Sequence, residues 1–155
     1  MPDTIAHYRV VATLGEGGMG VVYAADDERL QRRVALKMVR GTGADPKSRE
    51  RLWREARAAA SVSHPNVCQL YEIGEANGEL FIAMELLQGE VLSEPLRRGA
   101  LSVADAVSIA LEMLAALSAL HASGVIHRDL KPANVFLTTH GVKLLDFGLA
   151  RPEAA

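Results

Sequence analysis

The sequence predicts an α+β fold in two parts: an antiparallel sheet with one main helix over residues 1–86, then a mostly helical part over residues 87–155. Three observations support this prediction. Short β-branched and apolar runs alternate with turn signals in the first part, as in an antiparallel meander. A single helical pattern, at residues 47–61, interrupts these runs. In the second part, apolar residues recur at helical spacing, most clearly over residues 103–120.

The elements of the first part are separated by glycine, proline and asparagine, which favour turns. The expected strands cover residues 8–14, 21–25, 33–39, 67–73 and 79–86. Asn77 and Gly78 form the turn between the last two strands. The helix ends at His64-Pro65-Asn66. Spacings of three and four bring these helix residues to one side: Leu52, Glu55, Ala56 and Ala59.

The second part is expected to begin after a hinge at residues 85–89. A short helix covers residues 92–98, and Ser102 is a good N-cap for a long helix that ends near Gly124. That helix is apolar on most faces, so we expect it inside a helical layer. A loop, a strand to Leu137, a turn at His140 and Gly141, and a strand over residues 142–145 follow.

Composition excludes several classes of function. The 155 residues are 49% hydrophobic and 23% charged, as in a globular protein, and the net charge of -2 gives no basic field for nucleic acid. The N-terminus does not resemble a signal peptide. The single cysteine, Cys68, is expected in the core and fits a reducing cytoplasm. Asp105 and Glu112 interrupt the apolar helix, which predicts a buried helix rather than a membrane segment.

A glycine-rich stretch is the first motif. Residues 15–22 fit the pattern G-x-G-x-x-G-x-V, with Gly15, Gly17 and Gly20 at the fixed positions and Val22 at the end. Glycine lets backbone N–H groups approach a phosphate closely, because no side chain stands in the way. A strand follows rather than a helix, which argues against a dinucleotide-binding motif. An ordinary glycine-rich hairpin is the alternative.

A lysine in a strand and a glutamate in the helix form a candidate pair. Lys37 ends the segment Val-Ala-Leu-Lys, and burying its ammonium group is costly unless an anion meets it. Glu55 lies on the packing side of the helix, where a lone carboxylate is also costly. Pairing them removes both costs and orients Lys37 toward phosphate oxygens. The alternative is an exposed Lys37 at a strand edge and a solvated Glu55.

The most specific motif is His-Arg-Asp-Leu-Lys-Pro-Ala-Asn at residues 127–134, followed by Asp-Phe-Gly from Asp146. Phosphoryl transfer needs a carboxylate to accept the proton of the attacking hydroxyl, oxygen ligands for magnesium, and positive charge near the phosphoryl oxygens. Asp129 suits the first role and Lys131 the third. Asn134 and Asp146 suit the magnesium ligands. The alternative, ordinary turn residues, requires both motifs to occur at this spacing by chance.

In this order, the motifs resemble the protein kinase family over residues 8–151. The lysine two residues after Asp129 is similar to the serine/threonine branch, and the segments GEGGMGVVY and HPNV look like its bacterial members. The resemblance implies ATP and Mg2+ as cofactors, and a protein with a serine or threonine as substrate. It also implies a protein-kinase-like fold with a strand-rich N-lobe and a helical C-lobe.

The resemblance implies roles that no pattern indicates. Glu85 and Leu87 would offer backbone groups to the adenine edge, and Met84 would lie at the back of the adenine pocket, or be an ordinary core methionine. His127 and Phe147 would stack in the core of the active arrangement. Four apolar side chains would enclose the adenine: Leu14, Val22, Ala35 and Leu137.

The family continues beyond the Asp-Phe-Gly motif through an activation segment and further helices. The resemblance therefore implies a truncated catalytic domain, with weak or no transfer to protein and a possibility of self-association through its exposed helical surface. A non-catalytic module that binds nucleotide or pairs with another kinase stays open. So does a small-molecule kinase, although the glycine motif and Lys131 argue against it.

Overall fold

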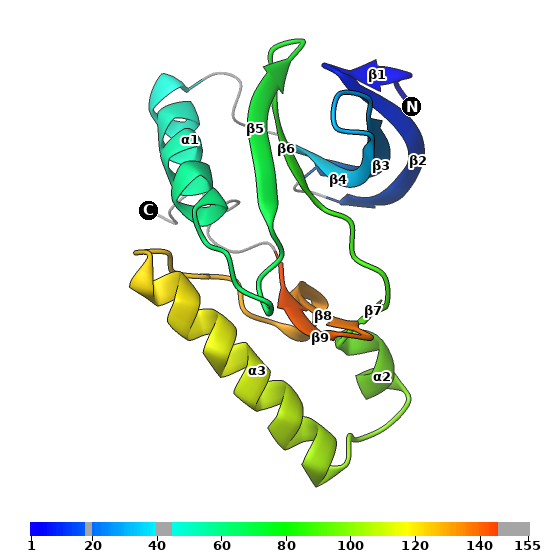
Figure 1. Cartoon of the computed structure of the whole chain (residues 1–155), viewed down its shortest axis with the longest axis vertical. Helices are drawn as coiled ribbons and strands as arrows, with labels where there is room; N and C mark the ends of the chain where they lie inside the picture. The colour runs from blue at the N-terminus through cyan, green and yellow to red at the C-terminus, as the bar shows by residue number, and fades with distance from the viewer. Residues whose placement is uncertain (18–19, 40–44, 146–155) are drawn as a thin grey trace. The chain divides into compact units, whose positions relative to one another are not determined.

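The computed structural model describes all residues except 18–19, 40–44 and 146–155 (Figure 1). It divides into two compact units. Among the described residues, the first unit contains 1–57 and 70–86, and the second contains 58–69 and 87–145. This grouping differs from the sequence-based division only over residues 58–69. That stretch joins the second unit because its backbone hydrogen-bonds to a strand there, as Cys68 N–H does to Leu144 C=O at 3.0 Å.

The first unit holds a six-stranded antiparallel sheet in the order β1-β2-β3-β4-β6-β5. The strands are β1 (Thr4–Ile5), β2 (Tyr8–Gly17), β3 (Gly20–Asp27), β4 (Arg32–Val39), β5 (Leu70–Ala76) and β6 (Glu79–Glu85). All except the two-residue β1 were predicted. The predicted strand at 67–73 begins too early, because Val67 pairs with Leu144 of the second unit and only Leu70 onward pairs with β6.

Alternation along β4 fixes which face of the sheet is buried. Val34 and Leu36 point into the core of the first unit and are fully buried. Tyr8 packs edge-on against Phe81, with ring centroids 5.8 Å apart, and its hydroxyl donates to Glu72. Burial raises the pKa of Tyr8 well above its usual range, and the bond to Glu72 adds to this rise. The core is completed by Ile5, Val10, Ala25 and Ala83.

Helix α1 (Pro46–Ala60) lies beside β5 (Figure 1). The carboxylate of Asp45 accepts from the N–H of Lys47 at 3.1 Å, which satisfies a free donor at the helix start. Arg49 forms an ion pair with Glu75 of β5 at 2.6 Å and so ties the helix to the sheet. The predicted packing side is confirmed by three buried residues: Leu52, Ala56 and Ala59.

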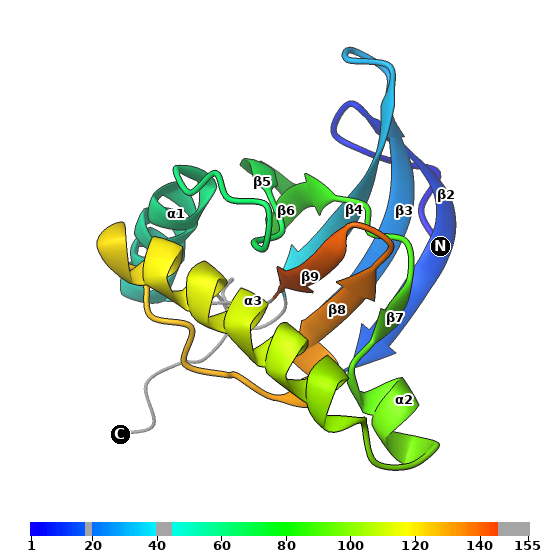
Figure 2. The same ribbon diagram turned by 60° about the horizontal axis from the view of Figure 1, so that its bottom comes forward.

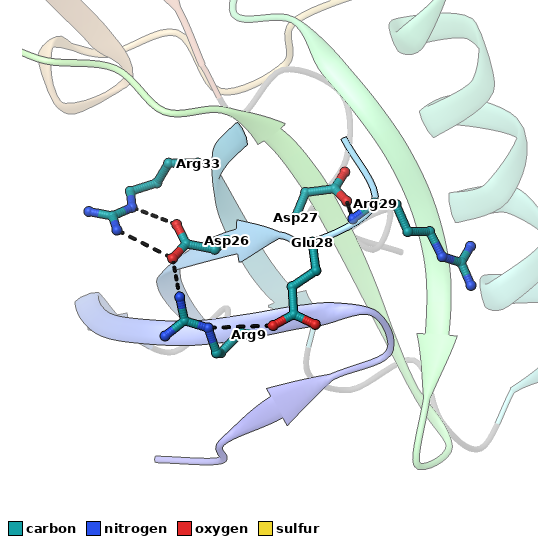
Figure 3. Close-up of polar contacts among 6 residues, drawn as sticks. All are labelled: Arg9, Asp26, Asp27, Glu28, Arg29 and Arg33. Atoms are coloured by element: carbon teal, nitrogen blue, oxygen red, sulfur yellow. Dashed lines mark hydrogen bonds and ion pairs between the residues drawn. The ribbon is translucent and has the colours of Figure 1, made fainter. Parts of the chain in front are cut away.

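Two adjacent aspartates organise the turn between β3 and β4 (Figure 3). The buried carboxylate of Asp27 accepts from the backbone N–H of Arg29 at 3.0 Å, which closes the turn. The carboxylate of Asp26 accepts from Arg33 and from Arg9, each at 2.8 Å. The bonds of Asp26 link β3 to its two neighbouring strands, β2 and β4.

The second unit contains a three-stranded antiparallel sheet in the order β7-β8-β9. Its strands are β7 (Glu90–Val91), β8 (Val135–Thr138) and β9 (Gly141–Leu144). Its helices are α2 (Ser93–Arg97), α3 (Val103–Ala122) and the 3-10 turn η1 (Pro132–Asn134). Only β7, at two residues, and η1 were not predicted. Cys68 is buried, as expected.

Helix α3 begins as predicted. The described residues do not bury it inside a helical layer, and it has the exposed helical surface that the resemblance implied. Ser102 is the N-cap and accepts from the N–H of Asp105 at 3.1 Å, and Gly124 follows the helix end at φ +76°. Only Ala116 and Leu120 are buried, because the described residues cover the helix on one side alone. Four large side chains are exposed: Val103, Val107, Leu111 and Leu114.

Helix α3 is also the one helix among the described residues that is long and apolar enough to cross a membrane, judged by length and composition alone. In the second unit it lies beside β9 (Figure 2), and Glu112 near its middle hydrogen-bonds to the backbone of that strand. The absence of a membrane segment stays a prediction.

Candidate active site

The second unit carries the residues predicted to do the chemistry. These residues lie in the loop over 127–134. His127, at its start, is 3% exposed and uses both ring nitrogens. Its Nε2 meets the carbonyl oxygen of Leu145 at 2.8 Å, and its Nδ1 meets the N–H of Asp129 at 3.2 Å. A carbonyl only accepts and an N–H only donates, so Nε2 carries the hydrogen and Nδ1 is bare. His127 is therefore a neutral imidazole that links the loop to the end of β9.

Arg128 has a left-handed backbone, at φ +68°. A non-glycine residue pays about 1–2 kcal/mol for this conformation, and such strain concentrates at functional sites. Here it turns the chain sharply between His127 and Asp129, so that the N–H of Asp129 reaches back to the imidazole.

Asp129, Lys131 and Asn134 come together in one loop, as the motif predicted. The side-chain amide of Asn134 donates to the Asp129 backbone oxygen at 2.8 Å and to its carboxylate Oδ2 at 3.1 Å. The Lys131 ammonium nitrogen is 3.6 Å from the same Oδ2. The turn η1 holds this spacing, since the Asn134 N–H donates to the Lys131 carbonyl at 2.9 Å. Their catalytic roles remain predictions.

The donor set fits a magnesium ion. Asn134 is 5% exposed and uses its amide nitrogen on Asp129, while no described residue donates to its amide oxygen. Among the described residues, no group of three or more histidine, cysteine or acidic side chains forms a metal site. Magnesium is commonly held by one or two side-chain oxygens together with phosphate oxygens, so this arrangement suits it. The other predicted ligand, Asp146, and Phe147 lie outside the described residues.

In the first unit, several residues predicted to contact nucleotide lie side by side on neighbouring strands. Gly15 pairs with Val22, and Val22 pairs with Lys37, across β2, β3 and β4. Directly opposed residues share a face of an antiparallel sheet, as do residues two apart on a strand. Val22, Ala35 and Lys37 therefore share the face opposite the Val34 and Leu36 core. Lys37 is nevertheless only 9% exposed.

At Gly15, the first glycine of the motif, the space that a side chain would occupy is empty of described atoms. A Cβ at Gly15 would have no described atom within 4 Å, and its backbone is not left-handed. The packing of the described residues thus gives no reason for glycine at this position, whereas a closely bound phosphate does. Gly17 pairs with Gly20 at the hairpin end. Leu14, which precedes Gly15, is 52% exposed.

Glu55 has a partner that the sequence analysis missed. Its carboxylate pairs with Arg51, one helical turn earlier, at 3.1 Å. The spacing of four on a helix was the signal that could have indicated this pair. The pairing of Glu55 with Lys37 remains a prediction.

The remaining predicted nucleotide contacts are distributed over both units. Glu85 pairs with Val34 at the end of β6 in the first unit. Leu87 and Leu137 are half-buried in the second unit. Met84 lies opposite Ala35 and is half-buried. The adenine-binding roles of these residues remain predictions.

Comparison with known proteins gives consistent matches. Residues 8–154 match the family model of the protein kinase domain. The chain is 41% identical over 150 residues to the probable serine/threonine-protein kinase pknA2 of Bifidobacterium longum, and 42% identical over 147 residues to the serine/threonine-protein kinase PknD of Mycobacterium tuberculosis. Each alignment covers 93% of this chain but only 20% and 22% of the respective relative, so the chain spans about a fifth of their length.

Solved structures agree. The crystal structure of the M. tuberculosis PknI kinase domain superposes with a TM-score of 0.89 at 34% identity, covering 97% of this chain and 62% of that one. The α+β fold expected from the motifs is confirmed by this match, as is the resemblance to bacterial serine/threonine kinases. The chain belongs to the protein kinase family.

Proposed function

We propose that this chain is the ATP-binding and catalytic-loop portion of a serine/threonine protein kinase, which transfers the γ-phosphate of ATP to a protein hydroxyl. One observation carries the proposal: Asn134 holds the Asp129 carboxylate at 3.1 Å while Lys131 lies 3.6 Å from the same oxygen. A base, a cation and an oxygen ligand for magnesium are thus combined in one short loop, as phosphoryl transfer requires.

Each residue has a distinct part in the transfer. Asp129 orients the substrate hydroxyl and takes its proton as the new oxygen–phosphorus bond forms and the bond to the bridging oxygen of ADP breaks. Lys131 offsets the charge of the transferred phosphoryl oxygens. Asn134 fixes Asp129 through its amide nitrogen and offers its amide oxygen to Mg2+. Asn134 and Asp146 would hold that ion, which would supply positive charge against the phosphate oxygens.

His127 supports this division of roles. Because its Nδ1 already accepts from the Asp129 N–H, the imidazole holds the backbone of the proposed base. Its Nε2 is bonded to the Leu145 carbonyl, so neither ring nitrogen has a free lone pair to take a proton from the substrate. His127 is therefore a positioning residue, and Asp129 is left as the base.

The test is transfer of labelled γ-phosphate to a generic basic protein. We expect Asp129→Asn to reduce the rate by about 100-fold or more, the usual range for removing a general base. Binding of ATP with Mg2+ should persist, because the variant keeps the shape of the side chain. Asp105→Asn, an exposed acid-to-amide change on α3, is the matched control. Measurable transfer by the wild type that Asp129→Asn leaves unchanged would contradict the proposal.

A second candidate function is a module that pairs with another copy, favoured by the exposed apolar side of α3. Leu111 and Leu114 are 62% and 61% exposed on adjacent turns. The paired change Leu111→Glu with Leu114→Glu is expected to convert a dimer into a monomer in sedimentation measurements. A monomeric wild type at high concentration would exclude this function.

A further inference from the structure

The outer edge of β9 is fully hydrogen-bonded although no complete strand lies beside it. Strand β9 pairs with β8 on one side only, and an edge strand normally presents unpaired N–H and C=O groups on the other. Here those groups belong to Val142 and Leu144. Leu144 is satisfied by backbone: its N–H donates to Asn66 at 2.9 Å and its carbonyl accepts from Cys68 at 3.0 Å.

Val142 is satisfied by two side chains instead. Its N–H donates to the Glu112 carboxylate of α3 at 2.6 Å, and its carbonyl accepts from the Asn66 side-chain amide at 2.9 Å. The same Asn66 amide lies 3.4 Å from Glu112 Oε2. We call Asn66, Glu112 and the Val142 backbone the β9 clamp. It joins three segments that are distant in the sequence, all within the second unit.

The surrounding packing is arranged for this contact. Glu112 is on the same side of α3 as the buried Ala116 and Leu120, at spacings of four, so it faces β9. Gly141 has φ +114°, and a Cβ there would stand 2.9 Å from the Glu112 carboxylate. Any side chain at this position would therefore push the carboxylate away from Val142. A carboxylate that accepts from a backbone N–H also forms a stronger bond than a neutral acceptor does.

The clamp is connected to the proposed site through the end of β9. Leu145, three residues after Val142, donates its N–H to the Asn134 carbonyl at 3.0 Å and accepts from His127 Nε2 at 2.8 Å. A shift of β9 along its own axis would move both bonds together. Asp146, the other proposed magnesium ligand, is the next residue in the chain.

We propose that Glu112 and Asn66 are positioning residues for magnesium: the β9 clamp fixes the strand that supports Asn134 and leads to Asp146. This inference rests on the proposed kinase function. A positioning role differs from a purely stabilising role in one measurable way. Losing the clamp should raise the Mg2+ concentration that nucleotide binding requires more than it lowers the nucleotide affinity at saturating Mg2+.

The experiment is a Mg2+ titration of the binding of a fluorescent ATP analogue to the full chain. Residues that orient metal ligands from behind typically change metal affinity about 10- to 100-fold. We expect Glu112→Ala to raise the half-maximal Mg2+ concentration about tenfold, at the lower end because the contact is indirect. Analogue affinity at saturating Mg2+ should change less than twofold. Glu112→Gln should keep the half-maximal Mg2+ concentration close to the wild-type value, because its amide oxygen still accepts from the Val142 N–H.

Two further variants keep the test decisive. Asp105→Ala removes an exposed carboxylate from the same helix and should leave the Mg2+ requirement unchanged. Glu112→Asp retains the charge but shortens the reach to Val142, so it should raise the Mg2+ requirement even if Glu112→Ala fails to fold. A folded Glu112→Ala or Glu112→Asp variant with the wild-type Mg2+ requirement would overturn the proposal.

Amide hydrogen exchange separates this inference from the proposed function. Exchange at Val142 should accelerate in Glu112→Ala and return toward wild type in Glu112→Gln, with or without nucleotide. A wild type that binds no nucleotide at any Mg2+ concentration contradicts the kinase function, and the positioning role with it. A wild type that binds normally, with faster Val142 exchange but unchanged Mg2+ dependence in the variants, contradicts the positioning role alone.

Discussion

Asp26 shows how single side chains connect neighbouring strands in the first unit. Its carboxylate accepts from Arg33 of β4 and Arg9 of β2, and Arg9 also lies 3.5 Å from Glu28 (Figure 3). The hydrogen bond from Arg33 holds the pKa of Asp26 below its usual range, and the charges of Arg33 and Arg9 act in the same direction. The folded state therefore favours the charged carboxylate more than the unfolded chain does.

This pKa shift predicts a pH-dependent contribution to stability. An acid with a lowered folded-state pKa stabilises the fold above its ordinary pKa and loses that contribution as pH falls through the lowered value. Asp26→Asn should therefore reduce the unfolding temperature at neutral pH, and the difference from wild type should vanish in strong acid. Added salt should reduce it as well. Thermal unfolding across pH checks this, with Glu79→Gln as an exposed control, and a pH-independent difference would contradict it.

Residues predicted to act together within a short segment lie close together in the structure. Asp129, Lys131 and Asn134 lie within six positions, so the local turn alone brings them together. Glu112 and Asn66 were missed, because each binds the backbone of a distant strand and no sequence pattern encodes a bond to backbone. Whether Lys37 pairs with Glu55 likewise depends on two separate elements, and the motif alone could not decide it.

Among the elements, β8 leaves no room for a side chain at Gly89, the residue before β7. This residue precedes β7 with φ +144°, and a Cβ there would stand 2.0 Å from the Leu137 carbonyl oxygen. Glycine at this position therefore serves two purposes: it permits the left-handed backbone and it leaves room for β8. Leu137 is one of the residues proposed to contact the adenine, so this packing also bears on the candidate site.

Comparing two glycines separates these purposes. Gly99 has a similar φ of +139° but no atom within 4 Å of its Cβ position. Gly99→Ala should cost about 1 kcal/mol in the free energy of unfolding, from backbone strain alone. Gly89→Ala should cost about 1–3 kcal/mol more, from the added overlap with β8. Denaturant unfolding of both variants checks this, and equal losses would show that the close approach contributes nothing.

Strand and helix order was predicted from local patterns, while their partners were not. The two-residue strands β1 and β7 are too short to show a period. The predicted strand at 67–73 was one apolar run that the fold divides between two sheets, through Val67 and Leu70. The apolar pattern of α3 correctly predicted a helix, but burial depends on what packs against it, and periodicity carries no information about that.

At the scale of the whole molecule, the proposed function draws residues from both units. Lys37 belongs to the first unit, and Asn134 belongs to the second. Lys37 and Asn134 are both predicted to act on the phosphates of ATP, Asn134 by way of magnesium. Stability of the whole chain should therefore respond to nucleotide and metal together.

We expect ATP with Mg2+ to raise the unfolding temperature and EDTA to remove most of the increase. A ligand at about 100 times its dissociation constant adds about 2.7 kcal/mol to the free energy of unfolding. For a chain of this length that corresponds to a rise of about 5–10 °C. AMP, which lacks the β- and γ-phosphates, should stabilise less and show no Mg2+ dependence. An ATP effect that is unchanged by EDTA would contradict the assigned magnesium ligand.

The closed edge of β9 also affects how this sheet behaves toward other chains. Exposed strand edges are templates on which foreign strands add, and proteins commonly protect them with charge or cover them. At Val142, a glutamate does both, because its carboxylate occupies the backbone donor and brings a negative charge to the edge. Loss of that side chain would expose the Val142 N–H to strands of other chains. Glu112→Ala, which is expected to raise the Mg2+ requirement, should therefore also aggregate more readily during expression or storage.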